Sequence, residues 1–240
     1  MTPLNRLRIE KAAADCGFEM TPLERDGGLE LRSARFPETV FVQQATSSTL
    51  MVTASSVGLL DAHDSVGIMT VDGFGALYEV LSTAAAHART LPNRVADAFR
   101  RDTADMPRST EAERVVVQRV GQNLFRAALL DYWQGRCCVT GLDIPELLRA
   151  SHIKPWADCD TDDERLDVFN GLLLTPSLDA LFDAGWVTFR EDGTIRLSPM
   201  LSPRGKAMLG VTEEMSVEHL RPEHLPYLDF HRRQVFRSGL

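Results

Sequence analysis

Three short stretches in the second half of the chain decide its fold: 150-ASHIKPW-156, 169-FNGLLLTP-176 and 177-SLDALFD-183. They place His152 18 residues before Asn170, and Asn170 nine residues before Asp179. Asp183 follows Asp179 by one helical turn, so the two carboxylates share one face of a helix expected over 177–184. Two carboxylates beside an amide and an imidazole form an oxygen-rich site that suits a hard divalent ion and leaves the histidine free to act as a base.

A long helix precedes this region, and a hairpin and a helix follow it. Thr110 is typical of an N-cap, and the helix is expected to run to about Trp133. One face of this helix carries Arg119, Gln122 and Arg126, and its apolar positions that can turn to a core are Val116, Val120, Leu124 and Leu130. Residues 136–176 read as irregular. Strands at 186–190 and 194–197, joined by a turn, and a final helix from about 223 complete the chain.

The first hundred residues predict a small module with helices and strands. Helices are expected at 4–16 and 74–88, and strands are expected at 29–32, 39–43 and 49–53. The stretch 89–110 is polar, rich in arginine and carries two prolines, which is typical of a linker. We therefore expect an α+β protein with an N-terminal module over 1–105, its linker starting at about 89, and a second domain over 106–240.

The composition indicates a folded protein in a reducing compartment. The 240 residues are 44% hydrophobic and 25% charged, which argues against a mostly disordered or coiled-coil chain. Four cysteines at irregular spacing are too few for a disulfide scaffold. We expect neither a secretion signal nor a membrane span, because residues 1–15 contain no apolar segment and no run of about 18 apolar residues occurs in the sequence. We expect a cytoplasmic protein with no membrane partner.

The net charge of −8 counts against nucleic acid as a partner, because phosphate binding depends on positive potential. Clustering matters more than the total, however, and 23 of the 26 basic residues are arginine, whose planar fork suits phosphate. A single arginine is most often an exposed surface charge. The candidates for phosphate contacts are Arg119, Arg126 and Arg232.

Several ordered motifs together resemble the HNH nuclease family, in which a hairpin and a helix hold one metal ion (the ββα-metal fold). Residues 114–236 are similar to the HNH half of predicted bacterial restriction endonucleases. The matching stretches are 119-RVGQNLFR-126, 138-CVTG-141, 151-SHIKPW-156, 170-NGLLL-174, 181-LFD-183 and 231-HRRQVF-236. The resemblance covers roughly half of the chain and leaves residues 1–105 unassigned.

The resemblance implies a role for each residue of the constellation. His152 matches the general base that takes a proton from the attacking water, and Asn170 matches the residue that holds the hairpin loop and orients this base. In some relatives that asparagine also touches the metal. Asp179 stands where the third letter of HNH is normally a metal-binding histidine, and Asp183 matches a second helix ligand of some branches. A histidine with a pKa of about 6.5 is a competent base at neutral pH.

The sequence departs from the family at two places. Ser151 stands where many relatives carry an acidic or histidine metal ligand, which predicts a weak metal site. Oxygen donors at Asp179 and Asp183 favour Mg²⁺ or Mn²⁺ over metals that prefer nitrogen. Many relatives also bind a structural zinc through two Cys-x-x-Cys pairs, whereas Cys137 and Cys138 are adjacent here. We therefore expect one divalent ion and no structural zinc.

These expectations combine into one function and one rival. The resemblance implies an endonuclease that cuts double-stranded DNA, of restriction type and either modification-dependent or specific for a plain sequence, with residues 1–105 as the target-recognition module. A monomer and a homodimer both stay open. The rival is a non-catalytic DNA-binding or scaffold protein with a degenerate HNH fold. His231 is open between a structural role and a phosphate contact.

Overall fold

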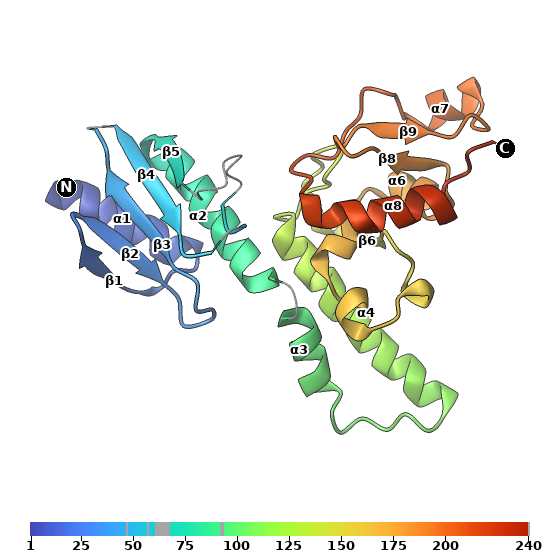
Figure 1. Ribbon diagram of the computed structural model, residues 1–240, viewed down its shortest axis with the longest axis horizontal. Coiled ribbons are helices and arrows are strands. Elements are labelled where there is room, and N and C mark those ends of the chain that lie inside the picture. The colour runs from blue at the N-terminus through green and yellow to red at the C-terminus, as the bar shows by residue number, and fades with distance from the viewer. Residues whose placement is uncertain (47, 57, 61–67, 92–93, 240) are drawn as a thin grey trace. The chain divides into compact units, whose positions relative to one another are not determined.

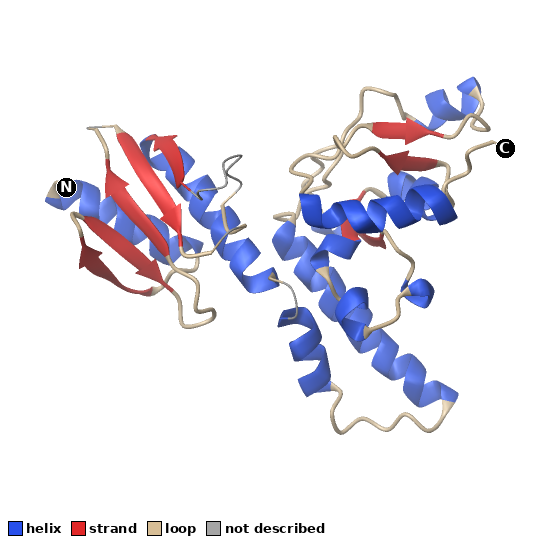
Figure 2. Ribbon diagram, in the orientation of Figure 1, coloured by secondary structure: helices blue, strands red, loops and turns tan. Residues whose placement is uncertain are grey.

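The computed structural model describes residues 1–46, 48–56, 58–60, 68–91 and 94–239. The chain divides into two compact units, Met1–Arg89 and Thr90–Leu240. Helices and antiparallel strands occur in both units, which confirms the expected α+β class (Figure 2). None of the helices within the described ranges combines the length and the apolar character that spanning a bilayer requires.

The first unit contains a five-stranded antiparallel sheet in which the strands follow chain order. Its strands are β1 (Met20–Arg25), β2 (Gly28–Arg32), β3 (Val40–Gln44), β4 (Thr49–Ala54) and β5 (Ile68–Asp72). The helices α1 (Pro3–Cys16) and α2 (Gly73–Thr90) lie against the same face of the sheet (Figure 1). The predicted helices and the three predicted strands of this unit are confirmed.

The strands that the pattern misses are the two edges of the sheet. β1 carries Pro22 and buries none of its residues, so it shows no apolar alternation that would predict a strand. The middle strands instead alternate as their pleat requires. Their buried side chains face the helices and form the core of this unit: Leu29, Leu31, Val40, Val42, Leu50 and Val52.

The second unit is organised around α4 (Glu111–Tyr132), which begins at the predicted Thr110. A capping box joins Thr110 to Glu113, because each residue bonds the backbone of the other. The buried stripe of α4 consists of Val117, Gly121, Phe125, Ala128, Leu129 and Tyr132. Val120, Leu124 and Leu130 are half-buried against the core, as predicted. The prediction for Val116 is wrong: it is 53% exposed, because the next position, Val117, faces the core.

A helix that the sequence does not suggest precedes α4. α3 (Arg94–Asp102) occupies the middle of the stretch that reads as a linker. Its Val95, Ala96 and Phe99 are buried in the core that α4 also contributes to. The boundary between the compact units therefore falls after Arg89, at the start of that stretch, and not near residue 105.

The ββα order that the resemblance implies is present. β6 (Arg149–His152) pairs with β7 (Gly171–Leu174), so the stretch that reads as irregular contains a hairpin. α6 (Pro176–Asp183) follows β7 directly. The loop of the hairpin carries η2 (Trp156–Asp158), α5 (Asp162–Arg165) and η3 (Val168–Asn170).

The rest of the second unit closes over α6. β8 (Val187–Phe189) and β9 (Ile195–Leu197) form the predicted hairpin. The predicted final helix is α8 (Leu225–Gln234), which the 3-10 turn η4 (Pro222–His224) precedes. Two further elements were not expected from the sequence, namely the 3-10 turn η1 (Pro145–Leu147) and the helix α7 (Pro203–Leu209).

Candidate active site

His152 ends strand β6 and is held by contacts on several sides of its ring. Its Nε2 lies 2.8 Å from the carbonyl oxygen of Arg165 in α5. The Phe125 ring of α4 stacks on it, with centroids 3.8 Å apart and an angle of 15° between the planes. Trp156 meets it edge-on at 5.5 Å. The ring therefore has one defined orientation in the hairpin.

These contacts decide which nitrogen of His152 can accept a proton. A carbonyl oxygen only accepts hydrogen bonds, so Nε2 carries the hydrogen in the neutral ring and Nδ1 keeps its lone pair. Burial lowers the pKa of His152 to about 4, although the bond to Arg165 opposes this change. This value is lower than the expected 6.5, and it keeps the imidazole neutral at physiological pH.

Asn170 is fully buried at the other end of the hairpin loop. Its Oδ1 accepts the backbone N–H of Lys154 at 2.7 Å. Its Nδ2 donates to the carbonyl oxygens of Lys154 and Glu164, at 3.2 and 3.1 Å, and contacts Cys159 Sγ at 3.4 Å. The side-chain amide thus ties three parts of the loop together, including the residue before Arg165. This geometry suits a positioning role for Asn170 rather than contact with a metal.

Asp179 and Asp183 lie one turn apart on α6, and Ser151 of β6 reaches toward them. The buried Ser151 hydroxyl donates to Asp183 Oδ1 at 3.1 Å. Burial raises the pKa of both carboxyls, and the nearby Asp179 raises the pKa of Asp183 further. The Ser151 hydroxyl opposes both increases, and the Arg149 charge opposes the increase at Asp179. The hairpin and the helix thus bring this pair together next to the backbone of His152.

The carboxylate pair fits one hard divalent ion held weakly. Within the described part of the chain, no three His, Cys, Asp or Glu side chains gather in a group that could hold a metal ion. Mg²⁺ is commonly bound through one or two carboxylates, while waters and substrate phosphates complete its shell. Asp179 and Asp183 could supply two such oxygen ligands, and a bound cation would relieve the repulsion that raises the pKa of Asp183.

The arginines proposed for phosphate contacts differ in their surroundings. Arg126 donates to the carbonyl oxygens of Leu148 and Pro145 at 2.7 and 2.9 Å. Arg232 is 17% exposed at its side chain and donates to the Phe189 carbonyl at 3.1 Å. Both therefore bind neighbouring backbone. Arg119 is exposed on α4 and has the accessibility that a phosphate contact needs.

His231 takes a structural position. Its ring is buried and stacks on Phe182, with centroids 3.8 Å apart. Its Nδ1 lies 2.9 Å from the Thr188 hydroxyl, and its Nε2 lies 3.0 Å from the Phe182 carbonyl. Both nitrogens therefore join α8 to the neighbouring elements, which leaves neither one for a phosphate.

The cysteines of this unit pack inside the protein. Cys137 and Cys138 belong to its core, where burial raises the pKa of the Cys138 thiol well above its usual range. Cys159 contacts the carbonyl oxygens of Lys154 and Pro155 within the hairpin loop. Cys138 thus behaves as a small apolar side chain.

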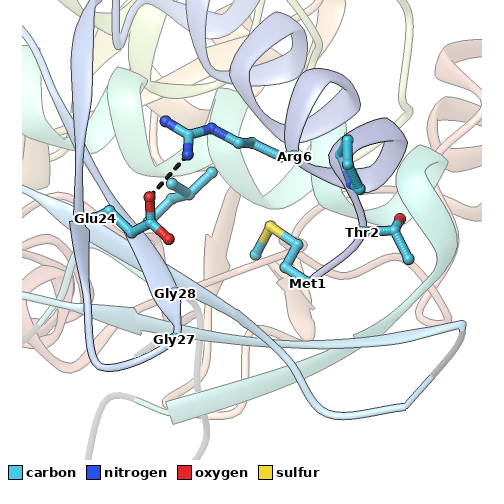
Figure 3. A pocket seen from close by; sticks show the side chains of 8 residues that line it. Met1, Thr2, Arg6, Glu24, Gly27 and Gly28 are labelled. Atoms are coloured by element: carbon cyan, nitrogen blue, oxygen red, sulfur yellow. Dashed lines mark hydrogen bonds and ion pairs between the residues drawn. The ribbon is translucent and has the colours of Figure 1, made fainter.

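The first unit has a pocket of about 340 Å³ that contains none of the predicted site residues (Figure 3). It lies between the start of α1 and the β1–β2 hairpin. Arg6 and Glu24, both of which line it, form an ion pair at 2.8 Å (Figure 3). Arg6 also pairs with Glu10 at 2.8 Å, so its charge is shared between two carboxylates at an exposed position.

Sequence reasoning missed the side chains that surround His152. Phe125 lies in a stretch that matches the family, but no spacing rule indicates that it stacks on the histidine. Arg165 acts through its carbonyl oxygen, which has no sequence signal. Trp156 also lies in a matching stretch, and it is half-buried against the His152 ring.

The matched family agrees with this geometry. Residues 137–190 match the model of the HNH endonuclease family, and the match includes the hairpin, α6 and the four constellation residues. The second unit contains an HNH-family domain. No curated protein matches the chain. The HNH domain supports nuclease activity at the level of the family, and HNH nucleases generally use a divalent metal ion and act on DNA.

Proposed function

We propose that the protein is a metal-dependent endonuclease that hydrolyses phosphodiester bonds in double-stranded DNA, with His152 as its general base. The observation that carries this proposal is the bond from His152 Nε2 to Arg165, which leaves the Nδ1 lone pair available next to the hairpin position that contacts the carboxylate pair. Members of the matched family supply the reaction class.

The residues of the HNH domain divide the reaction between them. Nδ1 of His152 takes a proton from a water molecule while the oxygen of that water bonds to phosphorus. The bond between phosphorus and the 3′ oxygen breaks, and solvent protonates the leaving oxygen. Asn170 keeps the loop closed, so that the Arg165 carbonyl stays in place to hold the imidazole. Bound phosphate groups raise the pKa of His152 and make it a stronger base.

Asp179 and Asp183 would hold one Mg²⁺ or Mn²⁺ ion. Such an ion stabilises the negative charge that develops on the phosphoryl and leaving oxygens. The Ser151 hydroxyl orients Asp183 for this task. A serine here, where many relatives carry a ligand, leaves two protein carboxylates and makes metal binding weak.

The first unit selects the target, as in a restriction-type enzyme. It has its own sheet, two helices and a core of its own, so it can act as a separate reading module. A first unit that reads a modified base would make the protein a modification-dependent restriction enzyme. A first unit that reads unmodified sequence would make it an ordinary sequence-specific one. The architecture of restriction-type enzymes, which pair a cutting domain with a reading domain, supports this assignment of the first unit.

The test is incubation of the full chain with methylated and unmethylated plasmid DNA in Mg²⁺ or Mn²⁺. Metal-dependent cleavage of either plasmid supports the nuclease, and a preference between plasmids identifies modification dependence. If the protein binds DNA but does not cleave it at any metal concentration, the result would favour the non-catalytic rival. A site with only two carboxylates is compatible with that rival. Calorimetric titration with Mn²⁺ shows whether the protein binds the metal, as the nuclease should, or does not bind it, as the non-catalytic rival predicts.

A further inference from the structure

The short helix α5 lies between His152 and helix α3. At its C-terminal end, the carbonyl of Arg165 accepts the hydrogen bond from His152. Near its start, both carboxylate oxygens of Asp163 accept from Nη1 of Arg100 in α3, each at 3.0 Å. A four-residue helix cannot bend between these two contacts, so a displacement of α3 would be transmitted to the Arg165 carbonyl.

A packing contact links the same two regions by a second route. Phe99 of α3 and Trp156 of the hairpin loop both pack against Gly121 of α4. A methyl group added at Gly121 would lie 2.7 Å from Trp156 Cη2 and 3.3 Å from Phe99 Cε2. Trp156 in turn meets the edge of the His152 ring. Helix α3 therefore reaches the surroundings of His152 through one polar contact and through the apolar packing around Gly121.

The side chain of Arg165 stiffens the segment between these contacts. Its guanidinium donates to the carbonyl of Trp156 at 3.3 Å, to Asp162 at 3.2 Å and to the carbonyl of Cys159. The loop that follows His152 is thus bonded internally as one body. The loop can still shift as a whole unless a contact to another element holds it. Helix α3, which lies outside the loop in sequence, provides such a contact through Arg100.

We propose that Arg100 is a positioning residue for His152 and acts through Asp163 and α5. This inference rests on the proposed nuclease function and extends the working site beyond residues 137–190, the part that matches the family. Catalysis is sensitive to displacements of about 1 Å, whereas an exposed ion pair contributes about 0 to 1 kcal/mol to stability. Arg100 and Asp163 are 47% and 46% exposed at their side chains. Removing either one therefore changes the rate of cleavage and leaves the fold intact.

The experiment compares Arg100→Ala, Asp163→Ala and the double variant in the full chain. Arg101→Ala is the matched control, since Arg101 is an exposed arginine on the same helix. The rate of single-turnover plasmid cleavage is measured at saturating DNA, together with the DNA dissociation constant and the Tm. We expect about a 3- to 5-fold lower rate in each single variant, no further loss in the double variant, and unchanged affinity. The control should cut at the parent's rate.

The acidic member of the pair makes the test specific. If Arg100 bound DNA phosphate directly, Arg100→Ala would weaken affinity, while Asp163→Ala would bind DNA at least as well as the parent and cut at its rate. That outcome would overturn the proposal, and so would additive losses in the double variant.

A nuclear magnetic resonance measurement tests the link without activity. The Nε2 proton of His152, identified by its loss in His152→Gln, should be protected from exchange in the parent and lose that protection in Arg100→Ala and Asp163→Ala. Retained protection in both variants overturns the link. A parent that cuts no DNA would instead refute the proposed function, and this signal would still report on the link.

Discussion

His152 donates its Nε2 hydrogen to the carbonyl oxygen of Arg165, 13 residues further along the chain, at 2.8 Å. The bond selects the tautomer that leaves the lone pair on Nδ1, the atom that we propose as the base. Because Asn170 binds the neighbouring carbonyl of Glu164, the residue that closes the loop also places the acceptor of this bond. The base and the loop that carries its support therefore form one unit.

His152→Ala should abolish cleavage while DNA affinity and folding stay nearly unchanged. The side chain acts only on the attacking water, and loss of a general base typically costs about 10²- to 10⁴-fold in rate. Single-turnover plasmid cleavage, DNA binding and circular dichroism check this expectation together. A variant that cuts within a few-fold of the parent would remove His152 from the mechanism.

Asp179→Ala should remove activity with every metal, and Asp179→His should change the order of metals. In the parent, oxygen donors favour Mg²⁺ and Mn²⁺ over Zn²⁺ and Ni²⁺, whereas imidazole at this position suits nickel, zinc and cobalt. Cleavage is measured against the concentration of each metal. If Asp179→Ala keeps the parent's rate and metal dependence, the catalytic ion is held elsewhere or is absent.

Asp183→Ala should weaken metal binding and be partly rescued by excess Mn²⁺. The remaining carboxylate, waters and substrate phosphate still offer oxygen ligands, but fewer of them belong to the protein. Asp143→Ala is the control, because Asp143 is an exposed carboxylate outside the pair. Equal metal requirements for Asp183→Ala, the control and the parent would show that Asp183 is no ligand.

The parts of the fold that the sequence predicts are those with local signals. The cap at Thr110, the alternation in β2 to β4 and the turn at 191–193 each act within a few residues, and all of them are found. β1 lacks alternation because none of its residues is buried. α3 is short and charged, and only its packing on α4 makes residues 94–102 part of the core.

The candidate site divides in the same way. His152, Asn170, Asp179 and Asp183 could be named from spacing and resemblance, and the hairpin and α6 place them in one region. Burial lowers the pKa of His152, and the ring that stacks on it, Phe125, lies 27 positions away, whereas the Arg165 carbonyl, 13 positions away, opposes this change. No residue pattern encodes such contacts, which is why the expected pKa was too high.

Gly121→Ala should slow cleavage even though alanine has the higher helix propensity, by about 1 kcal/mol. The added methyl would come within 2.7 Å of Trp156 Cη2, so the indole must shift from its position at the edge of the His152 ring. The measurement is the cleavage rate at saturating DNA beside the Tm. Ala127→Gly is the control, because it makes the reverse exchange at an exposed position of α4. It should change the stability and leave the cleavage rate unchanged. A faster or unchanged rate in Gly121→Ala would show that the Trp156 contact is irrelevant to the base.

Stability should fall between about pH 6.5 and pH 4, in part because of His231. Burial lowers the pKa of this histidine to about 4, compared with about 6.5 in the unfolded chain. The unfolded state therefore binds more protons in this window, and the stabilisation present above pH 6.5 is lost as the pH falls. The loss is on the order of 3 kcal/mol for one group. Urea unfolding at several pH values should show a smaller loss in His231→Gln than in the parent. Equal pH dependence in both proteins would contradict the buried neutral ring.

A fragment that starts at residue 90 should be more stable than one that starts at residue 106. The sequence places the second domain at 106–240, and such a fragment would lack α3 with its buried Val95, Ala96 and Phe99. Losing a buried phenylalanine alone costs about 3 to 5 kcal/mol. We therefore expect residues 90–240 to unfold cooperatively and at a higher temperature, and the shorter fragment to unfold at a markedly lower temperature or to be unfolded from the start. Circular dichroism during heating compares the two. Both fragments should also lose the target preference of the full chain if the first unit reads DNA, and a fragment that keeps this preference would place target selection in the HNH domain.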